Sequence, residues 1–451
     1  MKRKSLALLL MFCACSARLA TAGPAPVYKL LYSPPLGSSL GGLYGVFEGK
    51  PGLFYILSVW TGGTTGGAIF TVTSAGAFNP VYASPQFTNM GAFVQATNSE
   101  IYGGAFTNVK PYPNFYYSLE PSGANLQEYP FPGTWGPGFN TVVGPPNELY
   151  DIAGRVVNSQ TIFAFDHVTE TGKITILHQF AGNDGIPVDS SRMILATDGN
   201  LYGIGAQQEH GVSPMFIYRF TPSGAYSQLL TFPKVPNYDA FPLVSATDGY
   251  LYGTFAKGGV NNTGLLYRVS LTGEYNDFAS FPTTVSSPRS LMQAADGNLY
   301  GTTVYNQIFR YNFSTKAVEL VYQMDVEGSQ GHCACILVEG MDGRLYGVAP
   351  NGGNYPGNGA VFSLSIGLPK PAPMVSGLYP ASGPAGTKVV LWGDYLLGAT
   401  SVTFNGAPAS AINVTSGQSV IATVPSSATT GAVTIMTANG SFTTTSDFTV
   451  Q

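Results

Sequence analysis

Few residues of this chain have the types and the spacing that catalysis or metal binding requires. Neither a His-Glu-x-x-His pair nor a Cys-x-x-Cys pair occurs in the 451 residues. The stretch GSSLG at 37–41 fits the G-x-S-x-G nucleophile motif, but that motif needs a strand, a sharp turn and a helix, and no helical pattern surrounds Ser39. We therefore predict no catalytic residue, no metal site and no cofactor. The histidines are His167, His178, His210 and His332.

The most unusual local sequence is GHCACILVEGMDG, which places Cys333 and Cys335 directly after His332. Residues i and i+2 of an extended strand lie about 6.6 to 6.8 Å apart at Cα, which is the outer limit for a disulfide. The three side chains could bind a metal, but structural zinc needs four ligands and no fourth is nearby in the sequence. Inert thiols, a strained disulfide, and a metal or redox pair are the three interpretations that the sequence leaves open.

The N-terminal segment 1–22, MKRKSLALLLMFCACSARLATA, has the pattern of an export signal. A basic start precedes an apolar run of about 11 residues, and small residues end the segment. That run is too short for a bilayer-spanning helix, which needs roughly 20 residues, and no later segment is long enough. We predict a secreted, periplasmic or cell-surface protein. Acylation of Cys15 is the less favoured alternative because Phe12 and Cys13 fit a lipoprotein signal poorly.

The composition favours an all-β protein that does not bind nucleic acid. Without the segment 1–22 the chain has 16 Lys or Arg against 24 Asp or Glu, a net charge of about −8. Phosphate binding needs clustered Lys and Arg, and no such stripe occurs. Charged residues make up 10% of the chain, against a usual ~25%, whereas Gly reaches 56 and Tyr plus Phe reach 54.

A repeated stretch, typified by ATDGYLYGTF at 246–255, provides the framework for any site. The tyrosine of its Leu-Tyr-Gly, or of a degenerate form, recurs at a period of about 50 residues, the length of one repeat unit in several repeat architectures. Each period contains four short apolar segments and turn residues, with no helical pattern between them. The tyrosines are Tyr44, Tyr102, Tyr150, Tyr202, Tyr252, Tyr300 and Tyr346.

Four strands in about 50 residues is the size of one β-propeller blade. The seven periods therefore predict an all-β fold, a seven-bladed propeller over residues 27–367. The last period ends after its third strand, at 360–367, and VYKLLYS at 27–33 has the pattern of the missing fourth strand. Pairing of these two segments would close the ring and remove an exposed sheet edge.

The Asp-Gly pairs of the repeat predict tight two-residue hairpins between the first and second strands of a blade, so we interpret them as scaffold. The repeats resemble the GloVer tandem-repeat family of exported bacterial proteins, clearly over about 192–368 and more weakly over 27–180, where Asp-Gly is lost. The resemblance implies a propeller and export, but it implies no reaction.

A Pro-rich spacer at 368–373 separates the repeats from a different module. Residues 374–451 are rich in β-branched residues with Gly and Pro turns, which favours a small immunoglobulin-like sandwich. The segments YPASGPAGTKVVLWGDYL, GATSVTFNG and VTIMTANG resemble the IPT/TIG family. Lys388 is the only basic residue after Lys370, so we expect the spacer or adhesion form of this domain rather than a DNA-binding form.

One face of the propeller is predicted to carry the ligand. The separation from each repeat tyrosine to the aromatic residue of the third strand varies (26, 15, 15, 16, 15, 9 and 16), whereas the Asp-Gly turns hardly change. Variable loops on a rigid scaffold are where binding usually resides. An aromatic patch there could stack on sugar rings or a peptide, or simply pack against Pro and Gly. The candidate binding residues are Trp60, Tyr112, Trp135, His210 and His332.

These patterns favour an exported, non-catalytic binding or scaffold protein whose ligand is a polysaccharide or a cell-surface protein. The alternative is a propeller-type lyase or glycoside hydrolase, which would need acidic groups or histidines clustered on the same face. Glu209, His210 and His332 are the residues that the sequence places there, and they come from separated blades.

Overall fold

The computed structural model is built almost entirely of β-strands; η1 (Gly182–Asp184), a 3₁₀ turn, is the one helical element among the described residues. In that part of the chain no helix is long and apolar enough to cross a membrane. The described residues are 24–35, 38, 40, 42–58, 67–84, 87–107, 114–131, 136–138, 141–144, 148–157, 160–188, 192–207, 214–233, 243–325, 336–350, 353–354 and 359–451.

The described strands up to Ser365 form seven antiparallel sheets, here called blades 1 to 7. Blades 1 and 2 contain β2 (Leu43–Lys50), β3 (Leu53–Ser58), β4 (Ala68–Thr73) and β5 (Phe78–Ala83), then β6 (Phe87–Gln95), β7 (Ile101–Thr107), β8 (Phe115–Leu119) and β9 (Gln127–Pro130). Blades 3 and 4 contain β10 (Val142–Gly144), β11 (Glu148–Val157), β12 (Gln160–Val168) and β13 (Ile174–Gln179), then β14 (Ile186–Pro187), β15 (Ile194–Leu195), β16 (Leu201–Ala206), β17 (Met215–Phe220) and β18 (Tyr226–Thr231).

Blades 5 and 6 contain β19 (Val244–Ser245), β20 (Tyr250–Phe255), β21 (Leu265–Ser270) and β22 (Tyr275–Ser280), then β23 (Met292–Gln293), β24 (Leu299–Thr302), β25 (Gln307–Asn312) and β26 (Ala317–Gln323). Blade 7 contains β27 (Ile336–Glu339), β28 (Leu345–Ala349), β29 (Ala360–Ser365) and β1 (Val27–Tyr32). Within each blade the strands pair in chain order from the innermost outward, except that β14 and β15 both pair with β16 in blade 4 and β1 is the outermost strand of blade 7.

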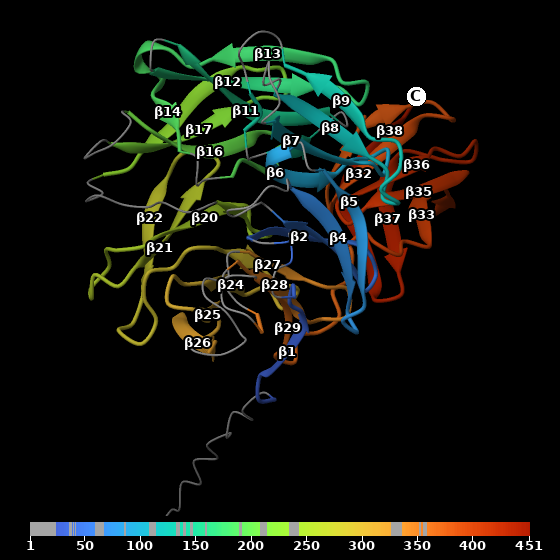
Figure 1. The fold of residues 1–451 in the computed structure, drawn as a ribbon. Helices are drawn as coiled ribbons and strands as arrows, with labels where there is room; N and C mark the ends of the chain where they lie inside the picture. The colour runs from blue at the N-terminus through green and yellow to red at the C-terminus, as the bar shows by residue number, and fades with distance from the viewer. Residues whose placement is uncertain are drawn as a thin grey trace, which may run out of the picture.

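Apolar clusters between successive blades hold the sheets in a closed ring. In the described part of the chain every pair of neighbouring blades shares one buried cluster, from blades 1 and 2 around to blades 6 and 7. A further cluster joins Phe54 and Phe70 of blade 1 to Tyr346 and Val348 of blade 7. A linear stack of sheets would have no such last contact, and Figure 1 shows the blades arranged around a common centre.

The predicted closing strand is confirmed. β1 pairs antiparallel with β29, with Val27 opposite Ser365 and Tyr28 opposite Leu364. The ring of Tyr28 also stacks on Phe362, with ring centroids 5.4 Å apart. The N-terminal strand therefore covers the edge that blade 7 would otherwise expose.

The Asp-Gly turns differ in detail from the predicted two-residue hairpins. In blade 5, Ala246 N donates to Tyr250 O and Gly249 N donates to Ala246 O, so three residues form the loop. Gly249 has a φ of +82°, whereas Asp248 keeps a negative φ. This is a type I turn followed by a glycine bulge, which suits the twist of the flanking strands.

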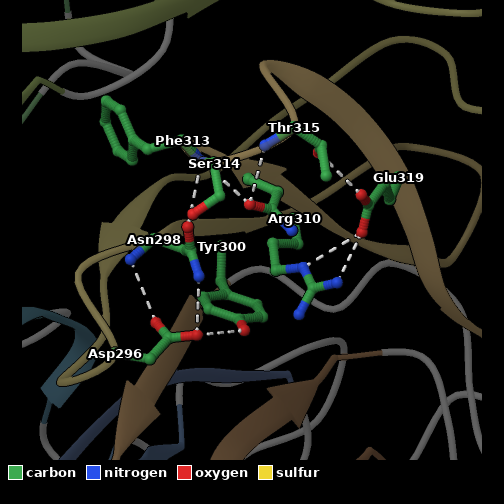
Figure 2. A network of polar contacts seen from close by, with 9 residues as sticks. Asp296, Asn298, Tyr300, Arg310, Phe313, Ser314, Thr315 and Glu319 are labelled. Carbon is green, nitrogen blue, oxygen red and sulfur yellow. Dashed lines mark hydrogen bonds and ion pairs between the residues drawn. The ribbon is translucent and has the colours of Figure 1, made fainter. Parts of the chain in front are cut away.

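The aspartate of each turn acts as a hydrogen-bond acceptor rather than as a residue that tolerates positive φ. In blade 6, Asp296 accepts from the Asn298 amide at 3.0 Å and from the Tyr300 hydroxyl at 2.9 Å (Figure 2). Asn298 Oδ1 then accepts from Phe313 N, which joins this turn to the next turn on the same face. Blades 4, 5 and 7 repeat the Asp–Tyr bond. In blade 2, Asn98 donates to the Tyr102 hydroxyl instead.

Tyr44 is not the blade 1 counterpart of the other repeat tyrosines, so that part of the predicted repeat is wrong. Tyr44 lies in the innermost strand, β2, and is 46% exposed, whereas the other six are fully buried in second strands. Tyr55 in β3 occupies the equivalent place, because it follows Gly52 as Tyr252 follows Gly249 and packs in the cluster shared with blade 2. Its hydroxyl donates to Pro121 O, as the Tyr102 hydroxyl donates to Glu170 O. Tyr55 precedes Tyr102 by nearly the interval that separates Tyr102 from Tyr150, which restores the period.

The C-terminal module is a two-sheet sandwich, as predicted. One sheet contains β30 (Met374–Tyr379), β32 (Lys388–Asp394), β36 (Ser419–Thr423) and β35 (Ala411–Ser416). The other contains β31 (Ser382–Gly383), β38 (Gly440–Val450), β37 (Gly431–Thr437), β33 (Ser401–Phe404) and β34 (Ala407–Pro408). Its apolar core, which includes Leu391, Phe404 and Phe448, lies between the two sheets.

Candidate functional site

The propeller has two different faces. The turn face carries the connections from first to second and from third to fourth strands, and the loop face carries the connections from second to third strands and from blade to blade. All predicted binding residues belong to loop-face connections that lie outside the described residues, so they stay predictions. The same holds for the cysteine pair and the export signal. These residues are Trp60, Tyr112, Trp135, His210, His332, Cys333, Cys335 and residues 1–22.

With Tyr55 in the place of Tyr44, the variation in loop length on the loop face changes. Counted from Tyr55 to Phe70, blade 1 has the same separation as blade 5 has from Tyr252 to Tyr267, so its loop is not unusually long. Blade 6 is then the exception, because its separation from Tyr300 to Phe309 is much shorter than that of any other blade. The variation in loop length therefore points to blade 6.

Three connections meet on the loop face at blades 5 and 6, at 256–264, 281–291 and 303–306; we call them the blade 5–6 rim. Ser287 N donates to Thr263 O at 2.7 Å, and Val304 N donates to Ser287 O at 3.0 Å, so the middle segment is bonded to both loops. Asn262, Ser287 and Asn306 have φ values of +54°, +55° and +62°. Non-glycine residues seldom adopt this left-handed conformation, and it is found at functional sites more often than elsewhere.

The blade 5–6 rim exposes apolar side chains on a fixed backbone. Val260 is 89% exposed, Tyr305 is 59% exposed and Val304 is 40% exposed. Tyr305 is held at its backbone, because its N–H donates to Thr303 Oγ1 at 3.2 Å and its carbonyl accepts from Gln323 Nε2 at 3.1 Å. Exposed apolar groups on an ordered surface are typical of a contact site.

Sequence reasoning missed these three residues. The available signal was the short separation between Tyr300 and Phe309. A connection this short forms a tight turn, and its tyrosine, Tyr305, cannot reach a buried core. Taking Tyr44 as the blade 1 reference hides that signal, because blade 1 then has the most unusual loop. The pairing of β2 with β3 shows that Tyr44 lies in the innermost strand, so blade 1 has no unusually long loop.

The C-terminal sandwich packs on the turn face of the propeller. The Tyr395 hydroxyl donates to Glu339 Oε2 at 2.7 Å, and Asn439 Nδ2 donates to the Met341 carbonyl at 2.9 Å. Both propeller residues lie at the first turn of blade 7. The orange and red strands of the sandwich lie beside the ring in Figure 1. These contacts leave the loop face as the face that the sandwich does not cover.

Side chains near this contact bond blade 6 to blade 5, blade 7 to blade 6 and blade 1 to blade 7. Gln293 Oε1 accepts from Thr247 N, Glu339 Oε2 accepts from Ala295 N, and Glu48 Oε2 accepts from Met341 N, at 2.7 to 2.9 Å. Burial raises the pKa of both Glu48 and Glu339 to about 7, although their hydrogen bonds oppose the rise. Both carboxyl groups accept backbone amides across blade junctions, and Glu339 is also buried.

Blade 3 contains a buried pair of carboxyl groups where other blades place glycine against an aromatic ring. Asp151 lies opposite Asp166, whereas Gly203 lies opposite Tyr218 and Gly253 opposite Tyr267. Tyr116 of blade 2 donates to Asp151 Oδ2 at 2.5 Å, and Gly138 N donates to the same oxygen at 2.8 Å.

Both aspartates are fully buried, and this burial together with the Asp151 charge raises the pKa of Asp166 well above its usual value. Burial therefore favours the protonated form of Asp166. No group of three or more His, Cys, Asp or Glu side chains suited to a metal ion occurs among the described residues. The pair anchors the connection between blades 2 and 3, and it is closed to solvent.

The fold and its repeated turns define a tandem-repeat β-propeller with an immunoglobulin-like C-terminal domain. Residues 189–383 match the Gloeobacter/Verrucomicrobia repeat, and residues 373–450 match the IPT/TIG domain. The chain therefore carries both modules, and the two resemblances drawn from its sequence are confirmed. No curated protein matches the chain.

Solved structures that resemble this chain are propellers at low sequence identity. An oligogalacturonate lyase in complex with manganese has a TM-score of 0.52 and 12% identity, covering 76% of this chain and 98% of its own. An oligogalacturonate lyase from Vibrio parahaemolyticus has a TM-score of 0.52 and 10% identity with the same coverage. A puromycin-hydrolyzing peptidase from Mycobacterium tuberculosis has a TM-score of 0.53 and 11% identity, covering 82% and 61%. At these identities the likeness shows the fold alone.

Proposed function

We propose that this chain is an exported binding or scaffold protein that holds a cell-surface polysaccharide or protein on the loop face of its propeller. The observation that carries the proposal is the blade 5–6 rim, where strained and hydrogen-bonded connections expose Val260, Val304 and Tyr305. A protein has no structural need to hold apolar groups in solvent on a fixed backbone, whereas a ligand that covers them gains from their burial.

Two further features support the proposal. The sandwich takes up the turn face, so the loop face is the one available to a large ligand. The export pattern of residues 1–22 would bring the chain to polymers of the cell envelope. The low content of charged residues favours contact through hydroxyl, amide and apolar groups over strong ionic binding.

The competing function, a lyase or glycoside hydrolase, needs acidic groups that reach a substrate. Asp151 and Asp166 form a close carboxyl pair among the described residues, but both side chains are fully enclosed. Glu209, His210 and His332 lie outside the described residues. No described observation favours catalysis, so we propose the binding function alone.

The test compares Tyr305→Ser with Leu320→Ser in the full secreted chain. Leu320 is 44% exposed but lies on an outer strand, so it is a matched control for loss of an exposed apolar side chain. Binding to purified cell envelopes is measured before and after protease treatment, which distinguishes a protein ligand from a polysaccharide. We expect Tyr305→Ser to weaken binding about tenfold and Leu320→Ser to leave it unchanged. Equal binding by both variants, or no binding by the unchanged chain, would contradict the proposal.

A further inference from the structure

A cleft of about 340 Å³ lies where the C-terminal sandwich meets the first turn of blade 4. The propeller contributes 197–199 and the sandwich contributes parts of β30, β32 and β38. The volume is at the small end of the range found for small-molecule sites. The cleft belongs to neither module alone, and it lies on the opposite face from the blade 5–6 rim.

A tryptophan forms the flat wall of this cleft. Trp392 lies opposite Gly377 in the pairing of β32 with β30, and a Cβ placed on Gly377 would come within 2.4 to 2.6 Å of the Trp392 ring. One face of the indole therefore lies against the backbone, where only glycine leaves room for it. Trp392 is partly exposed and lines the cleft, so the ring also presents surface to a ligand. Tyr379, which is 44% exposed, adds a second aromatic ring to the lining.

The rest of the lining is rich in hydrogen-bonding groups and carries negative charge. Asp198 comes from the propeller and Asp447 from the sandwich, with the hydroxyl-bearing residues 444–446 beside Asp447. The turn fixes Asp198, because its carboxylate accepts from Asn200 and from the Tyr202 hydroxyl at 2.7 Å. Carboxylate oxygens have further acceptor sites, and they suit ligand hydroxyl groups. No described residue of the lining is a Lys or Arg.

We propose that this cleft binds a neutral glycan, with a sugar ring on Trp392 and sugar hydroxyls on Asp198 and Asp447. A flat aromatic wall beside acceptor oxygens matches the apolar face and the hydroxyl edge of a pyranose. The two carboxylates disfavour a uronic-acid polymer through like-charge repulsion. The volume admits a short stretch of a glycan rather than a long one. This site is independent of the loop face and of the function proposed for it.

Calorimetric titration of the full secreted chain with neutral and acidic oligosaccharides tests the proposal. The probes are hexasaccharides of β-1,4-glucose, α-1,4-glucose and β-1,4-mannose, and an oligogalacturonate of equal length. We expect at least one neutral probe to bind and the acidic probe to bind at least tenfold more weakly. Trp392→Ala should raise the Kd of the neutral probe about tenfold or more. No binding of any neutral probe, or preference for the acidic probe, would overturn the proposal.

Two further variants keep the outcome interpretable. Thr445→Arg introduces a large side chain into the cleft from an exposed position. If Trp392→Ala lowers the melting temperature, loss of glycan binding by Thr445→Arg is the test of the cleft. Leu320→Ser removes an exposed apolar side chain away from both candidate sites and should leave the calorimetric Kd unchanged. If Thr445→Arg leaves the heat of binding unchanged as well, the glycan binds elsewhere and the cleft proposal fails.

Discussion

At the scale of single residues, the repeated aspartate is defined by the donors that it accepts. Asp296 accepts from Asn298 through the backbone amide and the side chain, and from the hydroxyl of the buried Tyr300. The Asp of each Asp-Gly pair, which predicts a turn, therefore also positions a buried tyrosine between blades. In blade 2, Asn98 with Ser99 at a φ of +71° reaches nearly the same geometry without Asp or Gly.

Asp296→Ala is expected to destabilise the protein by about 1 to 3 kcal/mol, because the Tyr300 hydroxyl and an amide lose their acceptor. The urea midpoint of unfolding measures the effect. Asp296→Asn is the matched control and should cost much less, since Asn98 already forms the corresponding bond to Tyr102. Equal losses for Ala and Asn would show that the carboxylate charge, and not the hydrogen-bond geometry, is what the turn needs.

At the scale of elements, the innermost strands β23 and β27 each connect their blade to the preceding one through one side chain. Gln293 of β23 and Glu339 of β27 occupy equivalent positions, opposite Leu299 and Leu345. Each accepts from a backbone amide of the preceding blade. Gln293 is neutral at every pH, whereas Glu339 titrates, so the two blade junctions should respond differently to pH.

Stability should fall as pH rises from about 4.5 to 7, because the folded protein keeps protons on Glu48 and Glu339 that the unfolded chain has released. Glu339→Gln removes one of these groups while keeping an acceptor oxygen, as Gln293 shows. We expect a smaller loss of melting temperature between pH 5 and pH 8 in Glu339→Gln than in the unchanged chain. The reciprocal variant, Gln293→Glu, should steepen the loss. A pH profile unchanged by both variants would argue against titration at these junctions.

At the scale of the whole molecule, the ring is closed by two segments far apart in the sequence. β1 completes the sheet of blade 7, and the cluster around Phe54 and Tyr346 packs blade 7 on blade 1. The sandwich then bonds to blade 7 through Tyr395 and Asn439. Blade 7, which combines strands from both ends of the repeat region, therefore both closes the ring and contacts the C-terminal sandwich.

Deletion of residues 24–32 should lower the melting temperature and promote aggregation, because β29 becomes an exposed edge. A peptide of residues 24–33 added in trans should restore part of the lost stability by pairing with that edge. A scrambled peptide is the control. A deletion variant that melts like the full chain, or a peptide that has no effect, would contradict closure by β1.

Local sequence was enough to predict the class of fold, the repeat, the closing strand and the identity of the C-terminal module. These features depend on periodicity and turn residues, which each repeat carries independently. Tyr44 shows the limit of that reasoning: Leu-Tyr-Gly at 43–45 matches the repeat, yet it lies in the innermost strand β2, and the position of the repeat tyrosine in β3 belongs to Tyr55. Pairing between strands determines which residue faces the neighbouring blade.

The candidate sites depend on contacts between distant segments. The blade 5–6 rim joins connections from two blades, the Asp151–Asp166 pair arises from strand register, and the cleft at Trp392 joins residues near 198 to residues beyond 375. Each combines groups whose proximity depends on ring curvature and domain packing, which no local pattern encodes. Local propensity sets the strands and turns, whereas burial across blades and between modules sets which side chains meet and which reach solvent.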